Sequence, residues 1–131
     1  MTNAWSAEDL ERIGNADELQ IGTKRADGTV RPWVPIWVVG VGDRVFVRTW
    51  YRRETGWFGH VLKSRRARIR VPELEVDVKV EVIGDPGTDF GASLVAAYRA
   101  KYAQYGNASV DRMVTDAAAA TTLQIIPEDG A

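Results

Sequence analysis

The side chains best suited to binding chemistry lie in one short segment, residues 48–58. Its donors for an anion are Arg48, Thr49, Arg52 and Arg53. A helix is expected to begin directly after them, and the first turn of a helix presents unpaired N–H groups and the positive end of the helix dipole. Arginine adds a planar donor set for phosphate, and Trp57 supplies ring surface beside it. We therefore expect a phosphate site here; the alternative is a solvated loop with Trp57 in the core.

Tryptophans on both sides of a proline form the second candidate, within residues 33–38. If this segment is a strand, one face carries Trp33, Pro35 and Trp37. The opposite face is aliphatic, with Val34, Ile36 and Val38. The aliphatic face would enter the core, which leaves the two indoles for a flat ligand. A tryptophan-covered subunit interface is an equally good interpretation, and both hold when the ligand lies between subunits.

Two isolated side chains are weaker candidates. Lys24 ends the first expected strand opposite the tryptophan face, where it would reach the same ligand unless it stays an exposed charge at a hairpin tip. His60 is the one histidine and has no carboxylate at a fixed spacing, so we interpret it as a packing or surface residue rather than a base.

The chain has no cysteine, which excludes disulfides and thiolate sites, and a single histidine cannot form a histidine cluster. We expect no metal site.

The last third of the chain carries a stripe of tyrosines at helical spacing. Its members are Tyr98, Tyr102 and Tyr105. This pattern is typical of a core or interface face of a helix, although one phenol reaching the ligand is a possible alternative. Arg99 and Lys101 on the same helix are expected to be solvated.

Length and composition indicate one globular domain spanning residues 1–131, with 45% apolar and 27% charged residues. No apolar run approaches the roughly 20 residues that cross a bilayer, and the N-terminus lacks a basic start followed by an apolar stretch. We therefore expect a cytoplasmic protein with no membrane partner. No glycine-rich dinucleotide loop or Walker-type lysine loop occurs, so nucleotide binding by those routes is unsupported.

Positive charge is concentrated between residues 44 and 70. This window holds nine basic residues and one acid, a net charge of +8, which leaves −9 for the rest of a chain whose total is −1. Such a block is often a solvated face, but it is also a candidate anion site. Nucleic-acid binding ranks last among its interpretations, because the acidic remainder would repel a long polyanion.

Hydrophobic periodicity and turn residues define the elements that must position these groups. Helices are expected over 6–14, 56–65 and 89–105, the second capped by Thr55. Strands are expected over 19–24, 30–41, 44–49, 67–71, 74–82 and 121–126, and a loop over 107–118. Pro32 and Pro35 place the second strand at an edge, at a bulge or beside a ligand. Six short strands, joined mainly by hairpins, favour an α+β fold that curls into a small barrel.

These segments together resemble a known group of proteins. The resemblance is carried by residues 24–38, 42–49, 56–62 and 68–71, with further likeness at 97–102 and 120–123. They are similar to the split β-barrel flavoproteins, which include pyridoxamine-phosphate-oxidase-like proteins and deazaflavin-dependent nitroreductases. The nearest named likeness is a bacterial family of unknown function, numbered 2255.

The resemblance implies a six-stranded antiparallel split β-barrel with three helices, paired as a homodimer with a flavin-type cofactor in a groove between the subunits. It places the segment 33–37 along the cofactor ring and the segment 48–57 at the phosphate. Residues 57–60 stand where the nitroreductases have a Trp-Tyr-His-like tract. The chain departs from them at 50–54, which replaces their serine-, lysine- and glycine-rich phosphate loop, so FMN and a deazaflavin coenzyme both remain open.

The preferred hypothesis is therefore an oxidoreductase-like protein that binds FMN or a deazaflavin. Its cofactor-binding residues would be Lys24, Pro35, Trp37, Arg48, Thr49, Arg52, Arg53 and Trp57. No proton relay from the protein is required, because hydride chemistry belongs to the cofactor. The alternative is a non-catalytic split barrel that binds an anionic small molecule.

Overall fold

The computed structural model describes residues 5–49, 56–84 and 87–128 of the chain. Its helices are α1 (Ala7–Asn15), α2 (Trp57–Ser64), α3 (Thr88–Tyr102), α4 (Asn107–Met113) and α5 (Asp116–Ala119), with a 3-10 turn, η1, over Ala103–Tyr105. Its strands are β1 (Leu19–Thr23), β2 (Val34–Ile36), β3 (Val38–Val41), β4 (Arg44–Val47), β5 (Arg66–Val71), β6 (Leu74–Val82) and β7 (Leu123–Pro127).

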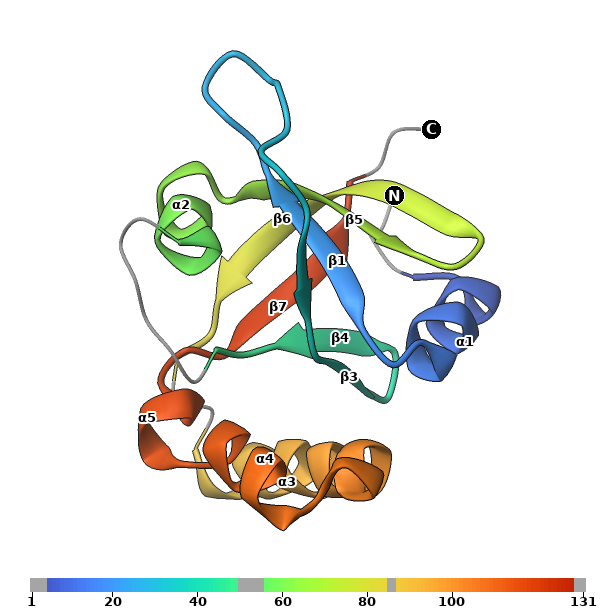
Figure 1. Ribbon diagram of the computed structural model, residues 1–131, viewed down its shortest axis with the longest axis vertical. Helices are drawn as coiled ribbons and strands as arrows, with labels where there is room; N and C mark the ends of the chain where they lie inside the picture. Colours follow the sequence, from blue (N-terminus) through green and yellow to red (C-terminus); the bar gives the residue numbers. More distant parts are fainter. Residues whose placement is uncertain (1–4, 50–55, 85–86, 129–131) are drawn as a thin grey trace.

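One antiparallel sheet contains all these strands, in the order β2-β1-β5-β6-β7-β4-β3. Its two end strands, β2 and β3, are not paired with each other but are separated along the chain by Trp37 alone, so the sheet curls into a nearly closed barrel (Figure 1). The α+β split-barrel expectation is confirmed. The strand number differs because the expected strand 30–41 breaks at Trp37, where it leaves β1 and begins to pair with β4.

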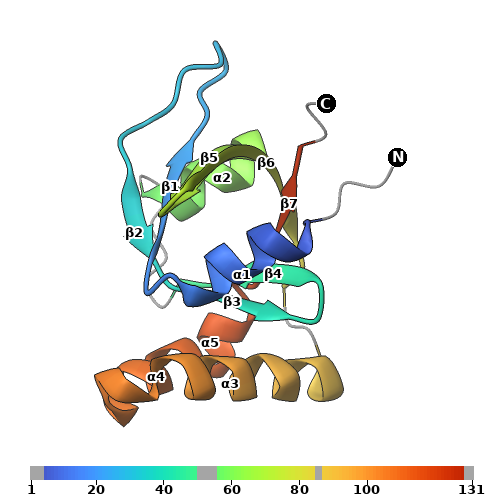
Figure 2. The ribbon, with the colours of Figure 1, turned by 90° about the vertical axis from the view of Figure 1, so that its right-hand side faces the viewer.

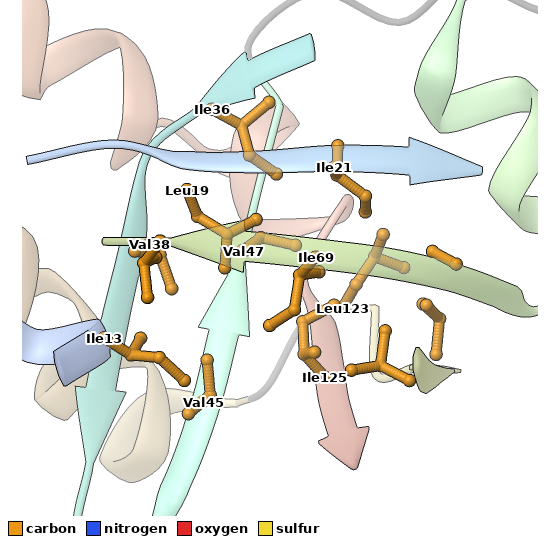
Figure 3. Packing of buried hydrophobic residues seen from close by; sticks show 14 of the residues in the cluster. Ile13, Leu19, Ile21, Ile36, Val38, Val45, Val47, Ile69, Leu123 and Ile125 are labelled. Carbon is orange, nitrogen blue, oxygen red and sulfur yellow. The ribbon is translucent and has the colours of Figure 1, made fainter. Parts of the chain in front are cut away.

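The barrel interior is aliphatic and follows the alternation read from the sequence. Figure 3 shows Leu19 and Ile21 of β1, Ile69 and Ile125 pointing into a common interior, together with Ile13 of α1. All five side chains are at most 1% exposed. Alternating apolar residues therefore supply the barrel core, because successive strand side chains point to opposite faces.

A second layer of helices lies against β3 and β4 (Figure 2). The expected loop over 107–118 is wrong: it contains α4 and α5. Val110 and Met113 lie one helical turn apart on α4 and are buried against the α3 residues Leu94, Tyr98 and Tyr102. This packing supplies the stability that a seven-residue helix lacks by itself. The expectation of three helices was therefore too low.

The helix starts differ in how well they were predicted. Ser6 caps α1 as expected, its Oγ accepting a hydrogen bond from the Asp9 N–H at 3.1 Å. The N-cap of α2 is Gly56, and the predicted cap, Thr55, falls outside the described residues. None of the helices in the described ranges has the length and apolarity needed to span a membrane.

Candidate functional site

The strand break at Trp37 creates a seam in the barrel. Leu19 faces Ile36 on one side and Val47 faces Val38 on the other. One further step of each ladder would set Trp37 opposite both Glu18 and Arg48. The indole therefore lies where the chain passes from one side of the barrel to the other.

A cleft of about 310 Å³ opens at this seam. Its walls are Glu18, Val34, Pro35, Ile36, Trp37, Arg48, Thr49, Trp57, Arg112 and Met113. They come from both sides of the seam, from the start of α2 and from the end of α4. A more open hollow of about 880 Å³ beside β5 and β6 has mixed charge and holds none of the predicted site residues.

Arg48 is the buried cation of the cleft, with only 2% of its surface exposed. Its Nε donates to Thr122 Oγ1 at 2.9 Å, and its Nη1 donates to the Met113 carbonyl at 3.0 Å. That carbonyl ends α4, where a cation complements the negative end of the helix dipole. The adjacent Thr49 N–H donates to Thr121 Oγ1 at 3.0 Å. Arg48 and Thr49 are thus held at fixed positions by the end of α4 and by the two threonines that precede β7.

Trp37 is held from the opposite side by α3. Its ring stacks on Tyr102 with centroids 4.0 Å apart and planes 2° from parallel, while Tyr105 lies tilted at 5.9 Å. Tyr102 is fully buried, and burial raises its pKa above the ordinary range of a phenol. Two tyrosines of the predicted stripe, Tyr98 and Tyr102, are core residues, and Tyr105 is 45% exposed.

The expectation that Lys101 is solvated is wrong. Its Nζ donates to the carbonyls of Val38, at 2.8 Å, and Ile13, at 3.2 Å. Partial burial of the ammonium lowers the pKa of Lys101 to about 8. Arg99, on the same helix, is exposed and pairs with Asp111, as its predicted solvated position allows.

The structure brings together the predicted residues Pro35, Trp37, Arg48, Thr49 and Trp57 as walls of the cleft. Arg52 and Arg53 fall outside the described residues. Lys24 is not brought to the cleft; its Nζ lies 3.2 Å from Asp77 and 3.9 Å from Glu128.

Trp33 also departs from the pattern expected of its segment. Its ring lies beneath the Arg70 guanidinium, 4.4 Å from centroid to Cζ, and is not among the cleft walls. The shared face predicted for Trp33 and Trp37 is thus divided, because the strand bends to a new partner between them.

Five wall residues were not predicted as site residues: Glu18, Arg112 and Met113, and also Val34 and Ile36, which the alternation had assigned to the core face. Glu18 could have been found by extending the β1–β2 register one step beyond Leu19. Arg112 and Met113 depended on recognising α4, and its signal was the apolar pair Val110 and Met113 after Gly106. His60 is half-buried on α2 and does not line the cleft.

The basic block between 44 and 70 is dispersed in three dimensions. Arg66 pairs with Glu128, and Arg68 pairs with both Glu75 and Asp77. Arg48 instead faces the cleft. Within the described residues there is no group of three or more histidine or acidic side chains placed to hold a metal ion.

Solved structures of similar fold come from several bacteria. HutZ, the haem storage protein of Vibrio cholerae, has a TM-score of 0.66 at 13% identity over 94% of this chain and 89% of its own. A candidate 5-nitroimidazole antibiotic resistance protein of Bacteroides thetaiotaomicron has 0.60 at 15% identity, over 95% and 80%. A candidate pyridoxamine 5′-phosphate oxidase of Lactobacillus delbrueckii has 0.54 at 15% identity, over 96% and 91%. At these identities the likeness establishes the fold alone.

Sequence comparison assigns the chain more specifically. No curated protein matches it. Residues 9–125, which include every element from the middle of α1 to β7, match the family described as uncharacterized proteins conserved in bacteria, DUF2255, and the chain belongs to that family.

Proposed function

We propose that this protein binds FMN or a deazaflavin coenzyme in the seam cleft and uses it as an oxidoreductase. The observation that carries the proposal is that one cleft joins an aromatic wall, Trp37, to the buried donors Arg48 and Thr49. A flat redox ring with an anionic tail needs both features. The fold likeness to a candidate pyridoxamine 5′-phosphate oxidase and to a candidate nitroimidazole resistance protein supports this class of ligand.

The aromatic end of the cleft suits a flat ring. Pro35 is exposed and Trp37 is half-buried and fixed against Tyr102. A ring lying on these side chains would exchange water for apolar surface, the dominant favourable term in such binding. When bound, the coenzyme supplies hydride transfer, and the protein's part is to hold and orient the ring and to exclude water.

The cationic walls of the cleft suit a phosphate. Arg48 is already desolvated and aligned by its bonds to Thr122 and Met113, so little ordering is required when an anion arrives. Trp57 begins α2, whose first turn contains no acidic residue, and the positive end of its dipole borders the cleft. Among the described cleft walls Glu18 is the one acid, and one further step of the β1–β2 ladder would set it opposite Trp37.

The size of the cleft indicates how much of the ligand it encloses. Small-molecule sites commonly measure about 300–1,000 Å³, and this cleft, at about 310 Å³, lies at the lower limit. One protomer would therefore cover part of a coenzyme. This favours the homodimer expected from the sequence, which stays a prediction and is tested by size-exclusion chromatography with light scattering. A cytoplasmic location likewise stays a prediction.

The test is titration of purified protein with FMN and with a deazaflavin, following visible absorbance and ligand fluorescence. We expect a shifted spectrum and quenched emission with one of them. Trp37→Leu should weaken binding about tenfold, the usual scale for one stacked aromatic ring. Its matched control is Trp33→Leu, because Trp33 belongs to the same sequence motif but lies outside the cleft. Equal effects of the two substitutions, or no spectral change with either coenzyme, would contradict the proposal.

A second candidate is a non-catalytic binding protein for a flat anionic molecule. The fold likeness to a haem storage protein favours it, because such a ligand makes the same two demands on the cleft. The candidates differ in turnover: with reduced coenzyme, an oxidoreductase consumes a quinone or nitroaromatic substrate. A binding protein shows only a ligand-dependent rise in melting temperature.

A further inference from the structure

The seam leaves backbone polar groups that no strand can pair. β1 begins at Leu19, so the N–H and C=O of Val38 that face this side have no ladder partner, and neither does the Asp17 carbonyl. Buried backbone groups require hydrogen bonds, since leaving one unpaired is costly. Some other part of the molecule must therefore complete the seam.

Two consecutive residues of α3, Lys101 and Tyr102, donate or accept the hydrogen bonds that pair these groups. The Val38 N–H donates to the Tyr102 hydroxyl at 3.0 Å, and that hydroxyl donates to the Asp17 carbonyl at 2.8 Å. Lys101 Nζ donates to the Val38 carbonyl at 2.8 Å. These three seam groups, the Val38 N–H, the Val38 carbonyl and the Asp17 carbonyl, are thus paired by α3, on the side of the seam away from the barrel interior.

The same tyrosine also supports the cleft wall. Its ring lies parallel to Trp37 at 4.0 Å between centroids, and Trp37 directly precedes Val38. The backbone of residue 38 and the side chain of residue 37 are therefore held by opposite parts of one phenol, the hydroxyl and the ring face. A shift of Tyr102 would move both.

We propose that Tyr102, assisted by Lys101, is the positioning residue that sets the Trp37 ring as the wall of the cleft. Neither side chain lines the cleft, so both would act on the ligand only through Trp37. The inference deepens the proposed function, on which its ligand-binding part rests. It makes α3 a determinant of affinity for flat ligands, although α3 contributes no wall residue.

The chain provides matched controls on the same helix. Tyr98 is as buried as Tyr102 and lies one turn earlier, but its hydroxyl has no hydrogen-bond partner among the described residues. Tyr98→Phe therefore deletes the same oxygen without opening the seam. Tyr105→Phe deletes the hydroxyl of the exposed tyrosine that also neighbours Trp37.

The experiment measures three properties in Tyr102→Phe and in Tyr98→Phe. They are hydrogen exchange at the Val38 amide by NMR, acrylamide quenching of the Trp37 emission, taken as the difference from Trp37→Phe, and the Kd for FMN, or for the deazaflavin if that is the coenzyme the wild type binds. In Tyr102→Phe we expect Val38 exchange and Trp37 quenching to increase and the FMN Kd to rise about fivefold to tenfold, the scale of one lost hydrogen bond. Competition by inorganic phosphate should be unchanged. In Tyr98→Phe and Tyr105→Phe all of these should match the wild type.

Each outcome decides the inference. An unchanged FMN Kd in Tyr102→Phe, or equal changes in Tyr98→Phe, would overturn it. If the wild type binds neither coenzyme, the proposed function is wrong, and the positioning role is then judged by Trp37 quenching alone: equal quenching in the two variants rejects it. If Tyr102→Phe does not fold, the test uses Lys101→Met, which removes the Lys101 bonds to the Val38 and Ile13 carbonyls but leaves the Tyr102 hydrogen bonds and the stack. This variant must show the same changes at smaller size, and wild-type values would reject the inference.

Discussion

The barrel interior and the layer beneath α3 are two cores of different chemistry. The first is mainly aliphatic, built from residues such as Ile21, Ile69 and Leu123. The second combines aliphatic side chains with three buried aromatic ones, Phe46, Tyr98 and Tyr102. The two cores lie on opposite faces of the same strands. In β4, for example, the odd-numbered residues face one core and the even-numbered residues face the other. A strand that feeds two cores must have both of its faces buried.

The candidate site lies where these two cores meet. Ile36 contributes from the barrel, and Met113 from the helical layer. Arg48 crosses the boundary, because it follows β4 and bonds to the end of α4. We therefore expect substitutions in the barrel to change mainly stability, and substitutions in the helical layer to change the cleft as well. The predictions below test that division.

The largest effect is expected from a cavity in the barrel. Ile69 is fully buried and pairs with Ile21 and Val76 on neighbouring strands. Ile69→Ala should lower the free energy of unfolding by about 3–4 kcal/mol, as large-to-small core substitutions do. Urea denaturation measures this. Val82→Ala, at a 42% exposed position of the neighbouring strand, is the control and should change stability by less than about 1 kcal/mol.

The next largest effect is expected at Gly22 of β1, where the chain leading into β2 packs closely. A Cβ on Gly22 would lie 2.4 Å from Val30 Cγ1 and 2.9 Å from the Arg31 carbonyl oxygen. Gly22→Ala should therefore destabilise by about 2 kcal/mol, the range for overpacking. Gly14→Ala is the control, since nothing lies within 4 Å of its added Cβ. A melting temperature for Gly22→Ala equal to that of Gly14→Ala would show that the Val30–Arg31 segment moves freely.

A smaller effect on stability, joined to an effect on the site, is expected in the helical layer. Val110 of α4 is 1% exposed, and Val110→Ala removes two methyl groups, about 1.5 kcal/mol of burial. Because α4 carries Arg112 and Met113 to the cleft, this substitution should also weaken FMN binding, whereas Ile69→Ala should not. Calorimetry of the two variants at a temperature where both are folded makes the comparison. If Ile69→Ala binds FMN more weakly than Val110→Ala does, the barrel and not the helical layer controls the cleft.

Most of the barrel could be predicted from the sequence because its signals are local. Alternation in β6 correctly places Val78 and Val80 in the interior. The Asp27-Gly28 turn forms with Gly28 at φ +89°, the conformation that favours glycine. The two prolines allowed an edge, a bulge or a place beside a ligand for this strand, and the structure shows the first of these, with β2 at one end of the strand order.

The site was predicted less completely because its geometry depends on contacts distant in sequence. Trp33 and Trp37 have the same local sequence pattern. They lie in different environments only because the strand changes its partner between them. Lys101 resembles any solvated helix lysine until the seam carbonyls of Ile13 and Val38 are seen to face it. The helix α4 has too few residues for periodicity to distinguish it from a loop, and packing on α3 decides its structure.

The smallest effect, and the most specific to the helical layer, concerns the pH dependence contributed by Lys101. Its pKa is lowered to about 8 in the folded protein from 10.5. Between these values the unfolded state binds more protons, so stability relative to Lys101→Met should rise with pH from about 8 to 10.5 and be flat on either side. The slope should be well below the limit of about 1.4 kcal/mol per pH unit, because the ammonium is only partly buried. Urea denaturation of both proteins across this range tests it, and the difference cancels the ionisation of Tyr98 and Tyr102, whose pKa values burial raises. A difference that does not change between pH 8 and 10.5 would mean that the pKa of Lys101 is not lowered and that its ammonium remains hydrated.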